Sequence, residues 1–74
     1  MYKVGQFFKD SCNDLYLLAQ VDMHKVAFIC LSSGNRWDNS FKVYNAYNIT
    51  NEEFKQICGT YCFEQVEVTI NSIL

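Results

Sequence analysis

The stretch Gly34–Asn39 holds the side chains best suited to recognising a partner. It reads Gly-Asn-Arg-Trp-Asp-Asn and contains the only tryptophan and the only arginine of the chain. Both residue types are enriched at the energetic centres of protein interfaces, and together they can also stack on a base or hold a phosphate. The alternative is a turn in which the tryptophan covers the core and the arginine pairs with a carboxylate. We predict a partner-binding role for Asn35, Arg36, Trp37 and Asp38.

Tyrosines form a second group of candidate recognition residues. Tyr44 and Tyr47 follow shortly after this stretch, and Tyr16 and Tyr61 lie elsewhere in the chain. A tyrosine joins a large apolar ring to a hydroxyl group, so it is favoured at interfaces that stay partly wet. We predict that Tyr44 and Tyr47 contact the partner. The alternative is that the tyrosines cover the outer face of a sheet.

The residues that could catalyse a reaction lack suitable neighbours. His24 lies in a predicted turn, and no nucleophile stands at a fixed spacing from it. Glu52 and Glu53 stand at a predicted helix start, where the helix dipole already favours acidic side chains. The sequence has no glycine-rich phosphate loop. We therefore predict a protein that is not an enzyme, has no catalytic residues and needs no cofactor.

The cysteines bear on both disulfides and metal binding. An even number in a short chain indicates disulfides in a secreted protein, but the N-terminus lacks the pattern of a signal peptide. Cys58 and Cys62 do not have the spacing of a close zinc-binding pair, and the chain has one histidine. We predict a cytoplasmic location, no metal site, and free thiols, with Cys30 as a small core residue.

Size and composition limit the remaining classes of protein. The chain has 74 residues, of which 50% are hydrophobic and 16% aromatic, so we predict one small folded domain over residues 1–74. The longest apolar run, residues 26–31, is far too short to span a membrane. The net charge is −2, and a single arginine argues against nucleic acid as a partner. A domain this short usually needs extra stabilisation from disulfides, a metal or a second subunit.

Hydrophobic alternation predicts the strands. Two apolar segments, Leu15–Val21 and Val26–Ser32, flank a short polar turn and are typical of an antiparallel hairpin. The other strands are predicted at Tyr2–Lys9, at Phe41–Tyr44 and within Thr60–Ile70. With one helix before the last strand, this order predicts a mostly β (α+β) fold, a small SH3-like five-stranded antiparallel barrel.

The helix has the clearest local signal of the sequence. Thr50 is followed three residues later by Glu53, which is the pattern of a capping box. Gly59 suits the left-handed residue that commonly ends a helix. We predict that this short helix packs on the sheet through Phe54, Ile57 and Cys58.

The last strand is a candidate contact between copies of the chain. A long β-prone strand near the C-terminus has an edge that must be paired or protected. A second copy would pair that edge and would add the buried area that a short chain lacks. We predict a homo-oligomer whose interface includes Val66, Val68 and Ile70.

Several stretches of the sequence resemble small proteins of phages and prophages of Gram-positive bacteria. They are Val4-Gly5-x-x-Phe8, Leu15-Tyr16-x-Leu18-Ala19-Gln20-Val21, Gly34-Asn35-Arg36-Trp37 and Ile49-Thr50-x-Glu52-Glu53-Phe54. The resemblance implies a role in host takeover or anti-defence inside the host bacterial cell. Such proteins occlude an immune protein or sequester a nucleotide signal.

These observations predict a non-enzymatic, phage-type binding protein that inhibits a bacterial immune component stoichiometrically. Its target is an effector protein or a nucleotide immune signal. The single arginine favours the protein target, because a phosphate-rich ligand usually needs more cations. The alternatives are a structural or assembly component of a phage particle and a weak nucleic-acid-binding SH3-like module.

Overall fold

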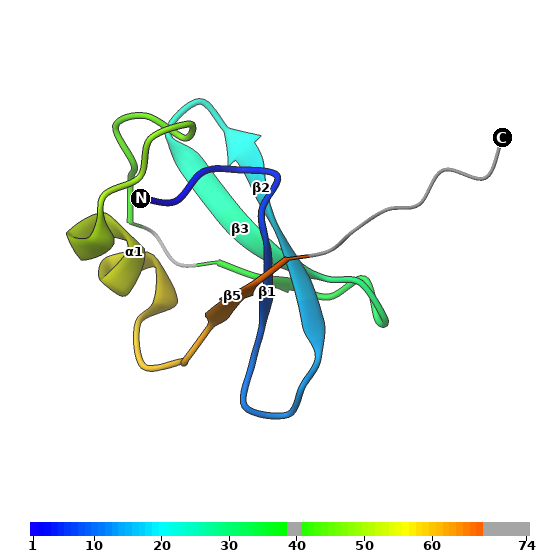
Figure 1. The fold of residues 1–74 in the computed structure, drawn as a ribbon. Coiled ribbons are helices and arrows are strands. Elements are labelled where there is room, and N and C mark those ends of the chain that lie inside the picture. The colour runs from blue at the N-terminus through cyan, green and yellow to red at the C-terminus, as the bar shows by residue number, and fades with distance from the viewer. Residues whose placement is uncertain (39–40, 68–74) are drawn as a thin grey trace, which may run out of the picture.

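The strands and the helix follow one another in the predicted order. The computed structural model describes residues 1–38 and 41–67. Four strands precede one helix, α1 (Asn51–Cys58), and a last strand, β5 (Glu64–Val66), follows it (Figure 1). The first four are β1 (Phe7–Lys9), β2 (Leu15–Asp22), β3 (Lys25–Cys30) and β4 (Arg36–Trp37). The prediction of a small, mostly β fold with one short helix is confirmed.

All five strands form one antiparallel sheet in the order β4-β3-β2-β1-β5. β2 and β3 form the predicted hairpin, in which Asp22 pairs with Lys25 across a two-residue turn. β4 and β5 are the two edges, and they do not pair with each other among the described residues. The sheet is therefore open, and its closure into an SH3-like barrel stays a prediction.

Aromatic rings fill the space between one face of the sheet and α1. Phe28 of β3 contacts Phe8 of β1, with ring centroids 5.3 Å apart, and stacks on Phe63 at 3.9 Å. Phe54 of α1 lies 5.2 Å from Phe8, and Tyr2 stacks on Phe54 at 3.8 Å. Aromatic side chains bury more area than any other type. This cluster therefore gives a short chain a dense core.

The helix α1 begins and ends where the sequence predicts. Thr50 Oγ1 accepts a hydrogen bond from the Glu53 amide at 3.1 Å, and Glu53 Oε1 accepts one from the Thr50 amide at 3.1 Å. These reciprocal bonds are the predicted capping box. Gly59 follows the helix with a φ of 62°. The buried side consists of the predicted residues Phe54, Ile57 and Cys58.

The fourth strand lies at a different place from the one predicted. The segment Phe41–Tyr44 is not a strand, so that prediction is wrong. The Val43 amide donates to the His24 carbonyl at 2.8 Å, so the turn between β2 and β3 holds this backbone. The strand β4 lies instead at Arg36–Trp37, inside the stretch Gly34–Asn39, for which no strand was predicted.

The first and last strands are shorter than predicted. Gly5 adopts a φ of 93° and turns the chain, so only the end of the predicted Tyr2–Lys9 strand pairs regularly. Tyr2 makes a single bridge to Ile49 instead. The last strand covers only Glu64–Val66 of the predicted segment among the described residues.

Candidate functional site

The stretch Gly34–Asn39 is divided between a turn and the sheet. Asn35 lies in the exposed turn after β3. Arg36 and Trp37 form the edge strand β4, which pairs with β3. Asp38 follows the strand, and the last residue of the stretch lies outside the described residues. Two of the four predicted binding residues, Arg36 and Trp37, are therefore held in place by the sheet edge.

Trp37 covers one edge of the core. Its half-buried side chain packs against the core cluster, and its ring centroid lies 4.2 Å from that of Tyr61. Phe28 is its partner across the β3–β4 ladder. The indole Nε1 is buried, and no atom of the described chain accepts its hydrogen. These contacts favour the interpretation of Trp37 as a core residue over that of a fully exposed anchor.

Arg36 pairs with Asp38 on the surface. The guanidinium Nε donates to Asp38 Oδ2 at 2.7 Å, and both side chains are exposed. An exposed pair of this kind contributes about 0.2–1 kcal/mol to stability, because solvent screens it. The pairing was one of the alternatives drawn from the sequence, and it orients the guanidinium without burying it.

Tyr44 and Tyr47 are the most exposed tyrosines among the described residues. The exposed fraction is 93% for Tyr44 and 70% for Tyr47. Their backbone is nevertheless fixed: the Tyr44 amide donates to Glu53 Oε2 at 3.2 Å, and the Tyr47 amide donates to Asn45 Oδ1 at 2.9 Å. Ala46, between them, is buried in the core. The two rings are therefore presented to solvent from an anchored segment.

The other two candidate tyrosines have structural contacts. The Tyr16 hydroxyl donates to Asp10 Oδ2 at 2.8 Å, and this bond raises the pKa of Tyr16 above its ordinary range. The Tyr16 ring also meets Phe63 edge-on at 5.1 Å. Tyr61 packs on Trp37. Tyr44 and Tyr47 are thus the pair whose rings the fold leaves open to a partner.

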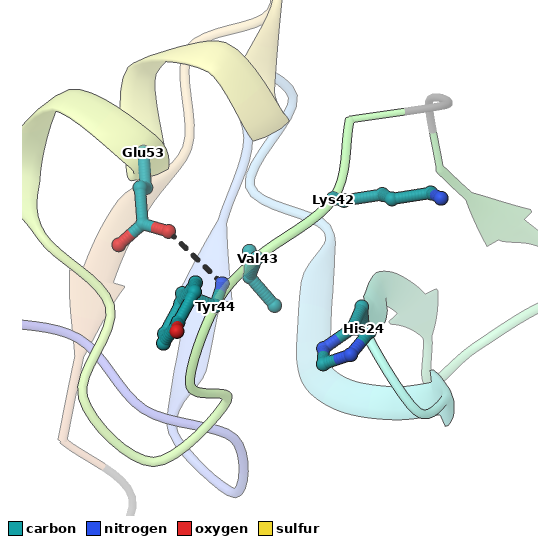
Figure 2. A pocket seen from close by; sticks show the side chains of 5 residues that line it. All are labelled: His24, Lys42, Val43, Tyr44 and Glu53. Carbon is teal, nitrogen blue, oxygen red and sulfur yellow. Dashed lines mark hydrogen bonds between the residues drawn. The ribbon is translucent and has the colours of Figure 1, made fainter.

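A hollow beside Tyr44 joins three separate parts of the chain. It has a volume of about 350 Å³ and lies where the β2–β3 turn, the segment before α1 and the first turn of α1 meet (Figure 2). It is lined by His24, Lys42, Val43, Tyr44 and Glu53. Sequence reasoning missed Lys42 and treated His24 as an isolated turn residue. No local spacing could have joined them, since the contact depends on the tertiary fold.

Glu53 connects the helix cap to this hollow. Its carboxylate accepts hydrogen bonds from the backbone amides of Thr50 and Tyr44, and these bonds hold the pKa of Glu53 below its ordinary value. The first bond fixes the start of α1, and the second fixes the segment that carries Tyr44. The Glu53 carboxylate therefore helps to hold the backbone at Tyr44.

We expect acid to weaken the fold partly through Glu53. A folded-state pKa below the unfolded one means that the carboxylate stabilises the fold above its ordinary pKa, about 4.3. That contribution is lost as the pH falls through the lower folded-state pKa. The thermal midpoint should therefore fall more between about pH 6 and pH 3 in the natural protein than in Glu53→Gln. If the thermal midpoints of the two proteins fell equally with pH, this role of Glu53 would be contradicted.

The cysteines are free thiols in different environments. All four are unpaired thiols, of which Cys30 and Cys58 are buried and Cys12 and Cys62 are exposed. A hydrogen bond with the Ser32 hydroxyl is the largest cause that lowers the pKa of Cys30 to about 7, whereas burial raises that of Cys58 to about 11. Cys30 lies in the core, as predicted. Within residues 1–38 and 41–67, no three His, Cys, Asp or Glu side chains converge on a metal position.

The predicted oligomer interface is described only in part. Val66 ends β5 at the sheet edge, where it pairs with Phe7 of β1 and is half-buried. Val68 and Ile70 lie outside the described residues. The structure therefore places one of the three residues at an open edge, and the interface stays a prediction.

Comparison with protein-family models, with curated proteins and with solved structures finds no match to this chain. The resemblance to phage proteins therefore stays a prediction. In the described part of the chain, the helix is too short and too polar to cross a membrane.

Proposed function

We propose that this chain is a non-enzymatic, phage-type binding protein that inhibits a bacterial immune component by stoichiometric contact. The observation that supports the binding role is the exposure of Tyr44 and Tyr47 on an anchored backbone. A rigid tyrosine offers a large contact area and loses little conformational entropy on binding. The phage and anti-defence context is supported by the sequence resemblance alone.

The proposed target is an effector protein, and a nucleotide immune signal is the second candidate. One exposed arginine and two exposed tyrosines suit the centre of a protein interface. The second candidate is favoured by a specific observation: His24 and Lys42 line the same hollow as Tyr44. Hydrogen-bond donors and an aromatic ring in one hollow match a phosphate attached to a base.

The test measures phage growth in bacteria that express the chain. Strains that each contain one anti-phage defence system are infected with a phage that the system blocks. Expression of the natural chain is expected to raise the plating efficiency in at least one strain. The double variant Tyr44→Ala/Tyr47→Ala should lose this effect, whereas Leu31→Ala, at another exposed apolar position, should keep it.

Two results would contradict the proposal. No gain in plating on any strain of the panel would overturn the inhibitor role. A full gain with the double tyrosine variant, expressed at the same level, would overturn the assignment of the surface to Tyr44 and Tyr47.

The homo-oligomer is part of the same proposal. The strand register places Val66, Phe7, Leu17 and Ile29 in one half-buried apolar row across β5, β1, β2 and β3. Successive strand residues face opposite sides, so this row lies on the face away from the buried Phe8 and Phe28. A second copy would cover the row and the open β5 edge. Sedimentation of a monomer at micromolar concentration would count against it.

The SH3-like barrel also belongs to this proposal. Closure would require the two edge strands, β4 and β5, to approach each other. The ring of Trp37 on β4 contacts Tyr61, which lies shortly before β5. That contact joins one edge strand to the segment before the other, and it supports the proposed barrel.

A further inference from the structure

The hollow beside Tyr44 has the size of a small-ligand site. Its volume of about 350 Å³ is at the lower end of the range for small-molecule pockets, about 300–1,000 Å³. Val43 lines it and is only 1% exposed, so this wall belongs to the packed core. The Val43 amide bond to the His24 carbonyl, at 2.8 Å, ties two of its walls together. The backbone of these two walls is therefore fixed by the fold.

One side of the hollow presents the hydrogen-bond donors of two side chains. His24 and Lys42 are exposed, and their side chains make no hydrogen bond or ion pair with any described residue. Figure 2 shows both on the same side of the segment, away from α1. An ammonium group supplies three N–H donors, and an imidazole supplies a further one or two. Such donors form their strongest hydrogen bonds with phosphate and carboxylate oxygens.

The other side offers an aromatic face and a hydrogen-bond acceptor. The Tyr44 ring is 93% exposed and provides a surface on which a planar base can stack. Each Glu53 carboxylate oxygen accepts one backbone amide, at 3.1 and 3.2 Å. A carboxylate has about four acceptor positions, so Glu53 can still accept from an amino or hydroxyl group.

We propose that this hollow binds a nucleoside monophosphate. The base stacks on Tyr44, the phosphate accepts hydrogen bonds from Lys42 and His24, and Glu53 accepts from a base amine or a ribose hydroxyl. A nucleic-acid strand is disfavoured, because one lysine and one histidine neutralise little of a phosphate backbone. This ligand specifies the second candidate target of the proposed function, the nucleotide immune signal. Only the biological role of the site rests on that proposed function.

The test titrates the isolated full chain with adenosine monophosphate, followed by amide chemical shifts and calorimetry. Adenosine and inorganic phosphate are titrated separately, to distinguish the ring from the anion. We expect adenosine monophosphate to bind more tightly than either, with shifts centred on His24, Lys42 to Tyr44 and Glu53. Tyr44→Ala should weaken binding about tenfold, the effect of losing one base stack. Lys42→Gln should weaken it by a similar factor, and the exposed Lys55→Gln should leave it unchanged.

The possible outcomes decide the question. Inorganic phosphate that binds as tightly as adenosine monophosphate would overturn the nucleotide assignment and leave a simple anion site. No saturable binding at millimolar nucleotide, or equal loss in the Lys42 and Lys55 variants, would overturn the site altogether. Tyr44 and Lys42 are exposed, so both variants should stay folded, which the amide spectra verify. None of these binding results determines the outcome of the plating assay. The nucleotide site and the inhibitor role can therefore be refuted separately.

Discussion

Replacing Phe28 with alanine should destabilise the protein more than any other single change we consider. Phe28 is fully buried and meets Phe8 at 5.3 Å, Phe54 at 6.0 Å and Phe63 at 3.9 Å. Truncation of such a ring removes buried area and leaves a cavity, at a cost of about 3–5 kcal/mol. A domain of this length has roughly 4–11 kcal/mol of unfolding free energy, at about 0.05–0.15 kcal/mol per residue. We expect the variant to be marginally folded or unfolded at room temperature.

Urea denaturation, followed by circular dichroism, measures this effect. Tyr47→Ala is the matched control, since it removes an aromatic ring that is 70% exposed. Its unfolding free energy should lie within about 0.5 kcal/mol of the natural value, as for most surface changes. A Phe28→Ala variant that loses no more stability than Tyr47→Ala would show that the aromatic cluster is not the main core.

The elements that were predictable from the sequence are those specified by neighbouring residues. The capping pair Thr50 and Glu53 and the terminal Gly59 depend on contacts within one helix, so their pattern is visible along the chain. The β2–β3 hairpin is likewise specified by two alternating segments and a short polar turn. Such features need no knowledge of the rest of the fold.

The elements that were not predictable depend on distant partners. The segment Phe41–Tyr44 has strand-forming residues, but the His24 carbonyl and the Glu53 carboxylate bind its amides. Tertiary hydrogen bonds therefore override its local preference. The edge strand Arg36–Trp37 is only two residues long, and a strand that short has no measurable alternation.

The same distinction applies to the candidate site. Tyr44 and Tyr47 could be selected from residue type alone, and both are exposed. The hollow that contains Lys42 and His24 could not be predicted from residue types, because its walls come from a hairpin turn, an irregular segment and a helix. Long-range contacts of this kind leave no periodicity or spacing in the sequence.

Trp37 is the residue for which sequence reasoning left two roles, and its variants distinguish them. Its side chain is half-buried against the core and packs on Tyr61 at 4.2 Å. Trp37→Ala should therefore cost about 2–4 kcal/mol, somewhat less than a fully buried aromatic truncation. Urea denaturation of the variant, beside Arg36→Ala as a surface control on the same strand, measures the loss. The Arg36 change should cost no more than about 1 kcal/mol, since it breaks only an exposed ion pair.

The buried indole nitrogen makes a second substitution informative. Trp37 Nε1 has no hydrogen-bond acceptor among the described residues, and an unpaired buried donor typically costs about 1–3 kcal/mol. Trp37→Phe keeps a ring against Tyr61 and removes that donor, so it should cost clearly less than Trp37→Ala. If Trp37→Ala instead keeps its stability and loses the gain in phage plating, the tryptophan acts as an interface anchor. If Trp37→Phe and Trp37→Ala lose the same unfolding free energy, removal of the unpaired nitrogen brings no gain in stability. The packing then requires the shape of the whole indole.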